Sequence, residues 1–307
     1  MSSVPNIPLV KLGDGTQIPV LGFGNGTAWY KPDRFSALNQ DMLDMAKAAI
    51  AAGYRHFDTA EAYGTEAELG QAIKESGIPR QEFFVTTKIA QTFSEGSPED
   101  AALGLENSLK RLQMDYVDLF LLHSPYCNKK MQYDEDNVAK QWKNIEPLQR
   151  SGKARSIGIS NFRKTHVENL LKTAQIKPAV NQIMFHPYLQ GAPEYAKWLQ
   201  SRGIAVQGFM GLLPLTQLKG KHLDSTLEEL AQKYGVSPST LLIRWELDQG
   251  IIVVNTTKKQ ERMREYFAAL DLKLTEEDYD RITKVGQETH LRLPGGELYN
   301  GRDYSPY

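Results

Sequence analysis

Short, mostly apolar segments that alternate with longer amphipathic segments constrain the fold of this chain more than any other feature. Three of the clearest run from Phe83 to Lys88, from Val117 to His123 and from Ile251 to Asn255. Near-continuous apolar runs of this length are typical of parallel strands that are buried on both faces. Eight candidate strands of this kind end near Gly22, Asp58, Lys88, His123, Ser160, Gln182, Phe209 and Asn255.

The segments between these strands show the apolar periodicity of helices that pack one face against a core. The stripe members are Leu38, Met42, Met45, Ala49 and Ile50 in one helix and Ala101, Leu105, Leu109 and Leu112 in another. A capping side chain followed by proline or by acids marks three helix starts, at Ser97, Ser237 and Thr275. We therefore predict helices between the strands.

Eight strands that alternate with helices predict an α/β fold, the (β/α)8 TIM barrel, as a single domain over residues 1–307. Leu9 to Val20 reads as an N-terminal β-hairpin, with its turn at Gly13 to Gly15. The segment from Leu291 to Tyr307 is predicted to be an ordered substrate loop that closes the pocket. An open doubly wound sheet is the alternative, but no G-x-G-x-x-G motif follows an early strand.

Charge and cysteine content exclude several classes of protein. Lys and Arg number 36 and Asp and Glu number 37, so the net charge of -1 argues against a nucleic-acid partner. Cys127 is the one cysteine, so no intrachain disulfide can form. The N-terminus lacks the pattern of a signal peptide, and no apolar run is long enough to cross a membrane. We expect a cytoplasmic protein that is a monomer or weak dimer.

Four titratable residues follow the predicted strands at the end where barrel enzymes place their active sites. Asp58, Lys88 and His123 close three strands, and Tyr63 lies five residues beyond Asp58. Each residue alone has an ordinary structural explanation, such as a helix cap or a solvated surface charge. Together they indicate a catalytic site.

The four groups have complementary roles in the reduction of a carbonyl. The developing alkoxide needs a proton, and Tyr63 is a poor acid at its ordinary pKa of about 10. We expect the Lys88 ammonium to lower that pKa. Asp58 keeps Lys88 charged and in place, and His123 orients the carbonyl oxygen by a hydrogen bond. The reaction predicted is hydride transfer with Tyr63 as proton donor.

Five segments of the chain resemble the aldo-keto reductase family. They run from Gly53 to Ile73, Val85 to Lys88, Asp115 to Pro125, Gly152 to Phe162 and Val180 to Pro187. The resemblance extends in order over nearly the whole chain. It implies a (β/α)8 barrel and NAD(P)H-dependent carbonyl reduction without a metal, with the family's catalytic tetrad on Asp58, Tyr63, Lys88 and His123.

The resemblance also implies a set of cofactor contacts. In this sequence they fall on Gly26, Thr27, Asp58, Ser160, Asn161, Gln182, Phe209, Met210, Gly211, Leu212, Thr256, Thr257, Arg262 and Glu265. Ser160, Asn161 and Gln182 match the residues that hold the nicotinamide carboxamide, and Phe209 replaces a stacking tyrosine.

The sequence also departs from the family pattern at three further places. Met210-Gly211 stands in place of Ser-Pro, Thr256-Thr257 in place of the Lys-Ser pair that binds the 2′-phosphate, and Tyr266 in place of an asparagine. Arg262 and the lysines at 258 and 259 remain near that phosphate position. We therefore predict a preference for NADPH over NADH that depends mainly on Arg262.

The predicted substrate contacts are Trp29, His123 and Ser124. Ser124 stands where many relatives carry tryptophan, and Ala90 replaces another aromatic residue. The resemblance is to the branch that reduces α-keto amides and conjugated polyketones, so the substrate is expected to be a small carbonyl compound.

Three other functions are open at this point. The chain could be a cofactor-binding regulatory subunit with slow turnover, or an imine reductase on the same scaffold. A metal-dependent hydrolase using Asp58, His123 and His186 is disfavoured, because Lys88 would place a repelling charge among the ligands.

Overall fold

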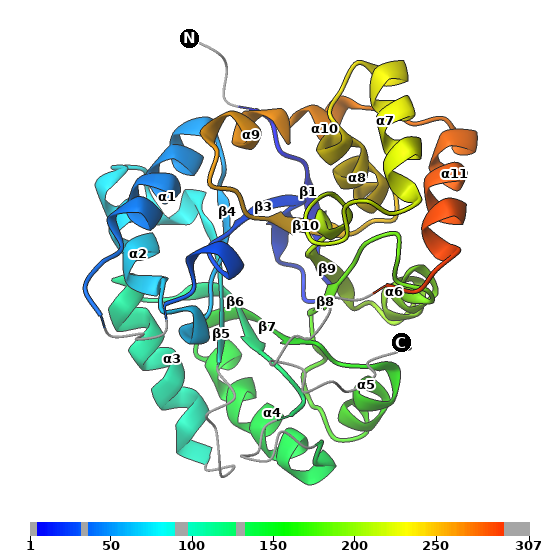
Figure 1. The fold of residues 1–307 in the computed structure, drawn as a ribbon. Helices are drawn as coiled ribbons and strands as arrows, with labels where there is room; N and C mark the ends of the chain where they lie inside the picture. The colour runs from blue at the N-terminus through cyan, green and yellow to red at the C-terminus, as the bar shows by residue number, and fades with distance from the viewer. Residues whose placement is uncertain (1–4, 32–35, 90–97, 127–132, 292–307) are drawn as a thin grey trace.

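Eight parallel strands form a closed barrel in the computed structural model, which describes residues 5–31, 36–89, 98–126 and 133–291. Helices surround the strands (Figure 1). The barrel strands are β3 (Leu21–Gly24), β4 (His56–Asp58), β5 (Phe84–Ile89), β6 (Val117–Leu122), β7 (Ala154–Ser160), β8 (Val180–Met184), β9 (Ala205–Phe209) and β10 (Ile252–Asn255). Pairing of β10 with β3 closes the ring. The (β/α)8 fold is confirmed, and the open sheet is excluded.

The predicted strand ends agree with the structure to within about two residues. The largest differences are at β3, which continues to Gly24, and at β8, which continues to Met184. That residues 1–307 form a single domain stays a prediction. No helix in the described ranges is long and apolar enough to cross a membrane.

The helices of the described chain occupy the predicted intervals. They are α1 (Gln40–Ala52), α2 (Glu66–Glu75), α3 (Pro98–Leu112), α4 (Glu135–Arg150), α5 (Lys164–Leu171), α6 (Ala192–Gln200), α7 (Leu223–Tyr234), α8 (Pro238–Leu247), α9 (Gln260–Glu265), α10 (Ala268–Asp271) and α11 (Glu276–Gln287). Ser237 and Thr275 accept hydrogen bonds from the backbone as N-caps, whereas Ser97 lies outside the described residues. The placement of Leu38 on the buried stripe is wrong. Asn39 caps α1, so Leu38 precedes the helix and is 48% exposed.

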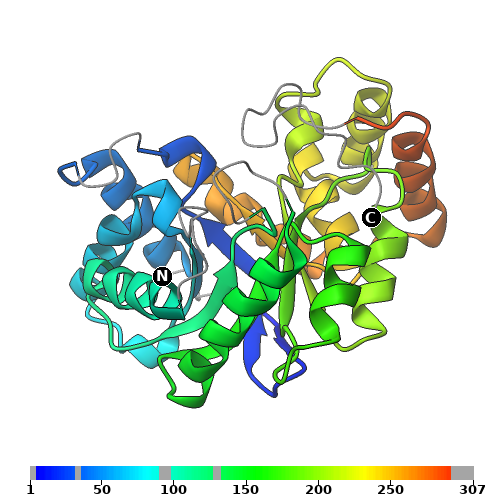
Figure 2. The same cartoon turned by 90° about the horizontal axis from the view of Figure 1, so that it is seen from below.

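The N-terminal hairpin is confirmed as β1 (Leu9–Lys11) paired with β2 (Gln17–Pro19), and it lies at one end of the barrel (Figure 2). Leu12 and Ile18 from this hairpin pack with interior barrel residues that include Leu119, Val180 and Ile252. The hairpin therefore fills the amino-terminal end of the barrel and leaves the carboxyl end for a site.

A buried histidine lies inside the barrel above this plug. His56 of β4 is fully buried, and its Nδ1 lies 3.0 Å from the carbonyl oxygen of Pro19. Burial lowers the pKa of His56 to about 4, although Asp58 and the bond to Pro19 favour the charged ring. Its ordinary pKa is about 6.5, so the folded protein holds this ring neutral.

We expect the free energy of unfolding to fall as the pH is lowered from about 6.5 to about 4. Over this window the unfolded chain binds a proton that folded His56 excludes, so stability is fully present above the window and lost below it. One histidine contributes up to about 1.4 kcal/mol for each pH unit.

Urea unfolding at several pH values, in wild type and His56→Gln, measures this dependence. The substitution removes the titrating ring and should reduce the slope without abolishing it, because burial also lowers the pKa of His166. An unchanged slope in the variant would contradict the assignment.

Candidate active site

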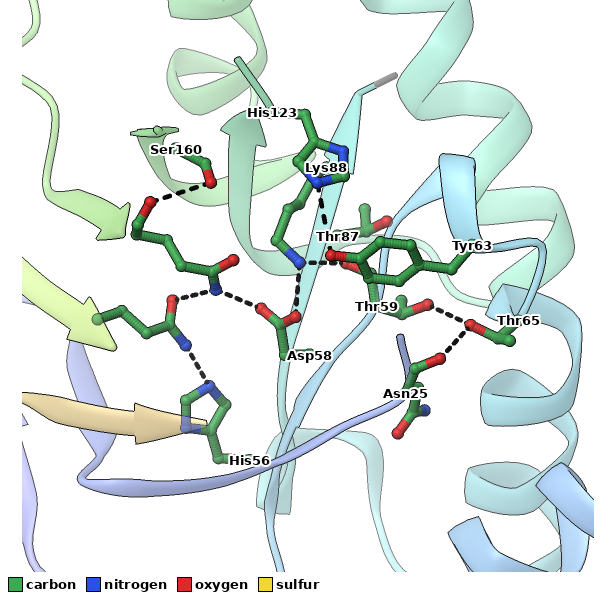
Figure 3. Close-up of polar contacts among 12 residues, drawn as sticks. Asn25, His56, Asp58, Thr59, Tyr63, Thr65, Thr87, Lys88, His123 and Ser160 are labelled. Atoms are coloured by element: carbon green, nitrogen blue, oxygen red, sulfur yellow. Dashed lines mark hydrogen bonds and ion pairs between the residues drawn. The ribbon is translucent and has the colours of Figure 1, made fainter. Parts of the chain in front are cut away.

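An ion pair between Asp58 and Lys88 lies inside the barrel, at the carboxyl ends of β4 and β5. The Lys88 Nζ is 2.5 Å from Asp58 Oδ1 and 2.9 Å from the carbonyl oxygen of Thr59 (Figure 3). Lys88 is 0% exposed. Burial lowers its pKa, and Asp58 opposes that shift. A buried ammonium is stable only while a carboxylate and a carbonyl oxygen replace the water that it has lost.

Tyr63 lies above this pair at the end of a short 3-10 turn, η2 (Glu61–Tyr63). Its carbonyl oxygen accepts a hydrogen bond from Lys31 N at 3.0 Å. The ring packs directly on Gly26, where an added Cβ would lie 2.6 Å from Tyr63 Cε2. Gly26 is a predicted cofactor contact, and the structure shows that its missing side chain also makes room for Tyr63.

His123 follows β6 and faces Tyr63 (Figure 3). The Tyr63 hydroxyl and His123 Nε2 are 3.4 Å apart, and the two rings meet edge to face. Burial, together with the Lys88 charge, lowers the pKa of His123 to about 3. The imidazole is therefore neutral at physiological pH, and Nε2 can donate a hydrogen bond to a carbonyl oxygen in one of its two tautomers.

The Tyr63 phenol does not have the lowered pKa expected from the sequence. Burial raises the pKa of Tyr63, and the Asp58 carboxylate raises it further, so the expected direction is wrong. The Lys88 ammonium lies 4.9 Å from the centroid of the Tyr63 ring, and its hydrogen bonds go to Asp58 and Thr59. Lys88 therefore faces the ring, and Tyr63 keeps its proton at neutral pH.

The three predicted nicotinamide contacts lie together beside His123. Ser160 Oγ donates to the carbonyl oxygen of Gln182 at 3.0 Å, and Asn161 N donates to the same oxygen at 2.9 Å. Asn161 Nδ2 lies 3.0 Å from the His123 carbonyl oxygen. Asn161 has φ 63°, a conformation that asparagine tolerates better than most residues. These bonds link the carboxyl ends of β6, β7 and β8 and hold the three residues at one side of the barrel rim.

The predicted cofactor contacts from Phe209 to Leu212 begin at the last residue of β9. Met210 has φ 59°. Gly211 packs against the buried carboxyl group of Glu246 from α8, and an added Cβ would overlap the carboxyl group. Burial raises the pKa of Glu246 well above its ordinary value. The Glu246 carboxyl group thus fills the space that a proline at position 211 would need.

The predicted 2′-phosphate contacts lie in the turn after β10 and in α9. Thr257 is buried and its Oγ1 accepts from Lys259 N at 3.1 Å, whereas Arg262 is exposed. Glu265 is a hydrogen-bond acceptor for Ser237, so it lies on the α8 cap. Within the described ranges, Thr256 Oγ1 is buried and has no hydrogen-bond partner. An orphaned polar atom at Thr256 and an exposed arginine at the start of the following helix fit a polar, anionic group.

The predicted substrate residues are described only in part. Trp29 is buried in the short turn η1 (Thr27–Trp29), and the Lys258 ammonium lies 4.8 Å from its ring centroid. Ser124 is buried and accepts a hydrogen bond from Tyr126 N at 3.2 Å. Outside the described residues lie Ala90, Cys127, the side chain of Thr27 and the proposed substrate loop beyond Leu291.

Sequence reasoning missed Gln207 and His56, two buried polar residues that lie below the tetrad. Gln207 of β9 is buried and lies between Gln182 and His56, bonded to both. Gln207 precedes Phe209 by two residues in a strand, so both side chains point to the same face. A glutamine in an otherwise apolar strand was the available signal.

Gly26→Ala should lower kcat about a hundredfold, because the new Cβ displaces the Tyr63 ring and an error of about 1 Å in a reacting group costs about that much. Steady-state kinetics and NADPH titration would distinguish a displaced Tyr63 ring from weakened cofactor binding. Gly24→Ala is the matched control, since the nearest atom to its Cβ is a Val254 methyl carbon at 3.2 Å. A raised NADPH dissociation constant with unchanged kcat would assign Gly26 to cofactor binding alone.

Comparisons with known proteins agree with this geometry. The model of the Aldo/keto reductase family matches residues 21–287. An NAD/NADP-dependent indole-3-acetaldehyde reductase of Schizosaccharomyces pombe is 38% identical over 91% of this chain and 95% of its own length. An NADPH-dependent alpha-keto amide reductase of Saccharomyces cerevisiae is 36% identical over 96% of both chains.

Comparison with a solved structure indicates the same family. The aldo-keto reductase of Bombyx mori in complex with NADP superposes with a TM-score of 0.84 at 30% identity, covering 96% of this chain and 97% of that one. The family match, the two reductase relatives and the shared barrel agree with one another. The chain belongs to the aldo/keto reductase family.

Proposed function

We propose that this protein reduces a ketone or an aldehyde to an alcohol with NADPH, and that Tyr63 donates the proton. One observation carries the proposal: the Tyr63 hydroxyl and His123 Nε2 lie 3.4 Å apart, at one rim of the barrel, beside a buried lysine–aspartate pair. A carbonyl oxygen that lies to one side of this pair, at the apex of a triangle, is within hydrogen-bond reach of both the hydroxyl and the imidazole.

Side chains of this protein would donate the proton in this reaction and stabilise the charge that forms. Bound NADPH would supply the hydride for the carbonyl carbon. The oxygen then takes the proton of the neutral Tyr63 phenol, and the phenolate left behind lies beside the Lys88 ammonium. The stabilisation of that phenolate by Lys88 appears only as the proton leaves, so it acts on the transition state more than on the ground state.

His123 and Asp58 have supporting roles in this scheme. His123 is neutral, so it orients the carbonyl oxygen by a hydrogen bond without competing with Tyr63 as an acid. Asp58 holds Lys88 in place. The assembled tetrad favours an enzyme over a regulatory subunit, which would not need a proton donor.

The cofactor would lie across the carboxyl ends of β7 to β10. Ser160, Asn161 and Gln182 would hold the nicotinamide carboxamide, with Phe209 against the ring. Thr256 and Arg262 would meet the 2′-phosphate. A preference for NADPH fits an exposed guanidinium at this point, because its donors match a phosphate dianion.

We propose an α-dicarbonyl compound or an α-keto amide as the substrate class. Two relatives carry names of this chemistry, the alpha-keto amide reductase and a glyoxal reductase of Bacillus subtilis. Ser124 next to His123 in the chain is a small polar residue where the family often has tryptophan, which leaves more room for a substrate with a second polar group. A panel of dicarbonyls, simple ketones, aldehydes and cyclic imines, each with NADPH and NADH, tests this proposal.

Tyr63→Phe should abolish reduction while NADPH binding stays nearly normal. The phenol carries the transferred proton, and loss of a positioned acid costs about 10² to 10⁴ in rate. Turnover and fluorescence titration would measure the two effects. Tyr30→Phe, at an exposed tyrosine near the same rim, is the control and should behave as wild type. Near-normal kcat in Tyr63→Phe would remove Tyr63 from the mechanism.

Arg262→Ala should raise the NADPH dissociation constant about ten- to a hundredfold and leave NADH binding almost unchanged. The 2′-phosphate is the one group that differs between the cofactors, and one charge-assisted hydrogen bond is worth about this factor. Arg264→Ala on the same helix is the matched control. Equal NADPH affinity in wild type and Arg262→Ala would place the phosphate elsewhere.

A further inference from the structure

A line of hydrogen bonds crosses the barrel interior from the plugged end to Asp58. His56 Nδ1 lies 3.0 Å from the Pro19 carbonyl oxygen, and His56 Nε2 lies 3.2 Å from Gln207 Nε2. Gln182 Nε2 lies 2.9 Å from Gln207 Oε1 and 2.7 Å from Asp58 Oδ2. Figure 3 draws the line from His56 to Asp58 as dashes. The residues come from β4, β8 and β9, so closure of the barrel brings them together.

The two ends of this line determine the direction of every bond in it. The Pro19 carbonyl can only accept, so His56 Nδ1 carries the proton and Nε2 is left as an acceptor. Gln207 must then donate to His56 and turn its oxygen toward Gln182. At the other end the ionised Asp58 carboxylate can only accept, so Gln182 must present its nitrogen. Both ends require the same orientation of both amides.

The Gln182 side-chain amide consequently has one atom left for a ligand. Both N–H bonds of its Nε2 are used, one on Asp58 and one on Gln207. The atom that remains for a ligand is Oε1, which can only accept. A reversed amide would place its oxygen against the Asp58 carboxylate and against the Gln207 oxygen, and both contacts repel.

We propose that Gln207 and His56 are positioning residues, which make Gln182 present its oxygen to the nicotinamide carboxamide and so select the amide NH2 group of the cofactor. The proposal rests on the proposed function, in which Gln182 contacts that carboxamide. Gln207 also helps to keep the Gln182 nitrogen on Asp58, and thereby steadies the carboxylate that holds Lys88.

Loss of Gln207 would release one of the two restraints on Gln182. Its second N–H would be buried without a partner, which costs free energy. Turning that N–H toward an acceptor on the cofactor would satisfy it again. The Gln182 amide would then accept a cofactor whose carbonyl carries a methyl group instead of NH2.

Binding of NADPH and of its reduced 3-acetylpyridine analogue, in which a methyl group replaces the amide NH2, tests the proposal. We expect wild type to bind NADPH about tenfold more tightly than the analogue, the effect of about one hydrogen bond. Gln207→Met has a similar volume without an acceptor and should reduce the preference to about threefold or less. It should also lower kcat/KM with NADPH about tenfold or more, because Asp58 is less well held.

Two further variants separate positioning from a general loss of packing. Gln207→Glu keeps an acceptor toward Gln182 and should keep the preference for NADPH. Gln141→Met removes another buried glutamine, on α4, and should leave the preference unchanged even if it lowers stability.

An unchanged preference in Gln207→Met would overturn the proposal. A wild type that reduces carbonyls with NADPH but does not distinguish the analogue would overturn the positioning role and leave the proposed function intact. A wild type that neither binds NADPH nor reduces any compound of the panel would overturn both.

Discussion

The ion pair between Lys88 and Asp58 is the interaction on which the rest of the site depends. A fully buried ammonium is costly unless a carboxylate and further acceptors surround it. Here Asp58 and the Thr59 carbonyl do so. Asp58 accepts a hydrogen bond from Lys88 on one oxygen and from Gln182 on the other, so its negative charge also orients the Gln182 and Gln207 amides. The proposed catalytic groups and the line of hydrogen bonds to His56 therefore both depend on the Asp58 carboxylate.

The closed barrel makes this pair possible. The plug formed by the hairpin β1–β2 fills the amino-terminal end with apolar side chains, so polar groups gather toward the carboxyl end. His56 is a polar residue close to this plug, and it is accommodated because the Pro19 carbonyl and Gln207 satisfy both ring nitrogens. Satisfied polar groups in a low-dielectric interior hold one arrangement, whereas an unsatisfied group would favour others.

The protonation states follow from burial more than from charge. His123 is neutral and Tyr63 keeps its proton because protein atoms replace water around them. We expected Lys88 to dominate the acidity of Tyr63, and the structure places the ammonium over the ring. In the proposed mechanism, an acid that keeps its proton in the resting enzyme is available when the carbonyl oxygen gains negative charge, and Lys88 would contribute as the phenolate forms.

The sequence by itself determined the strands that precede Asp58, Lys88 and His123, since buried strands and capped helices are local patterns with a local cause. It also predicted that these residues and Tyr63 act together, because strand ends in a barrel meet at one rim. It could not show that Gly26 supports Tyr63, that Gly211 makes room for Glu246, or that Gln207 joins His56, which lies 151 residues away in the chain. Only the tertiary structure decided these contacts, because barrel closure joins strands distant in sequence. The same closure removes the water that would otherwise set the orientation of each amide and the pKa of each ring.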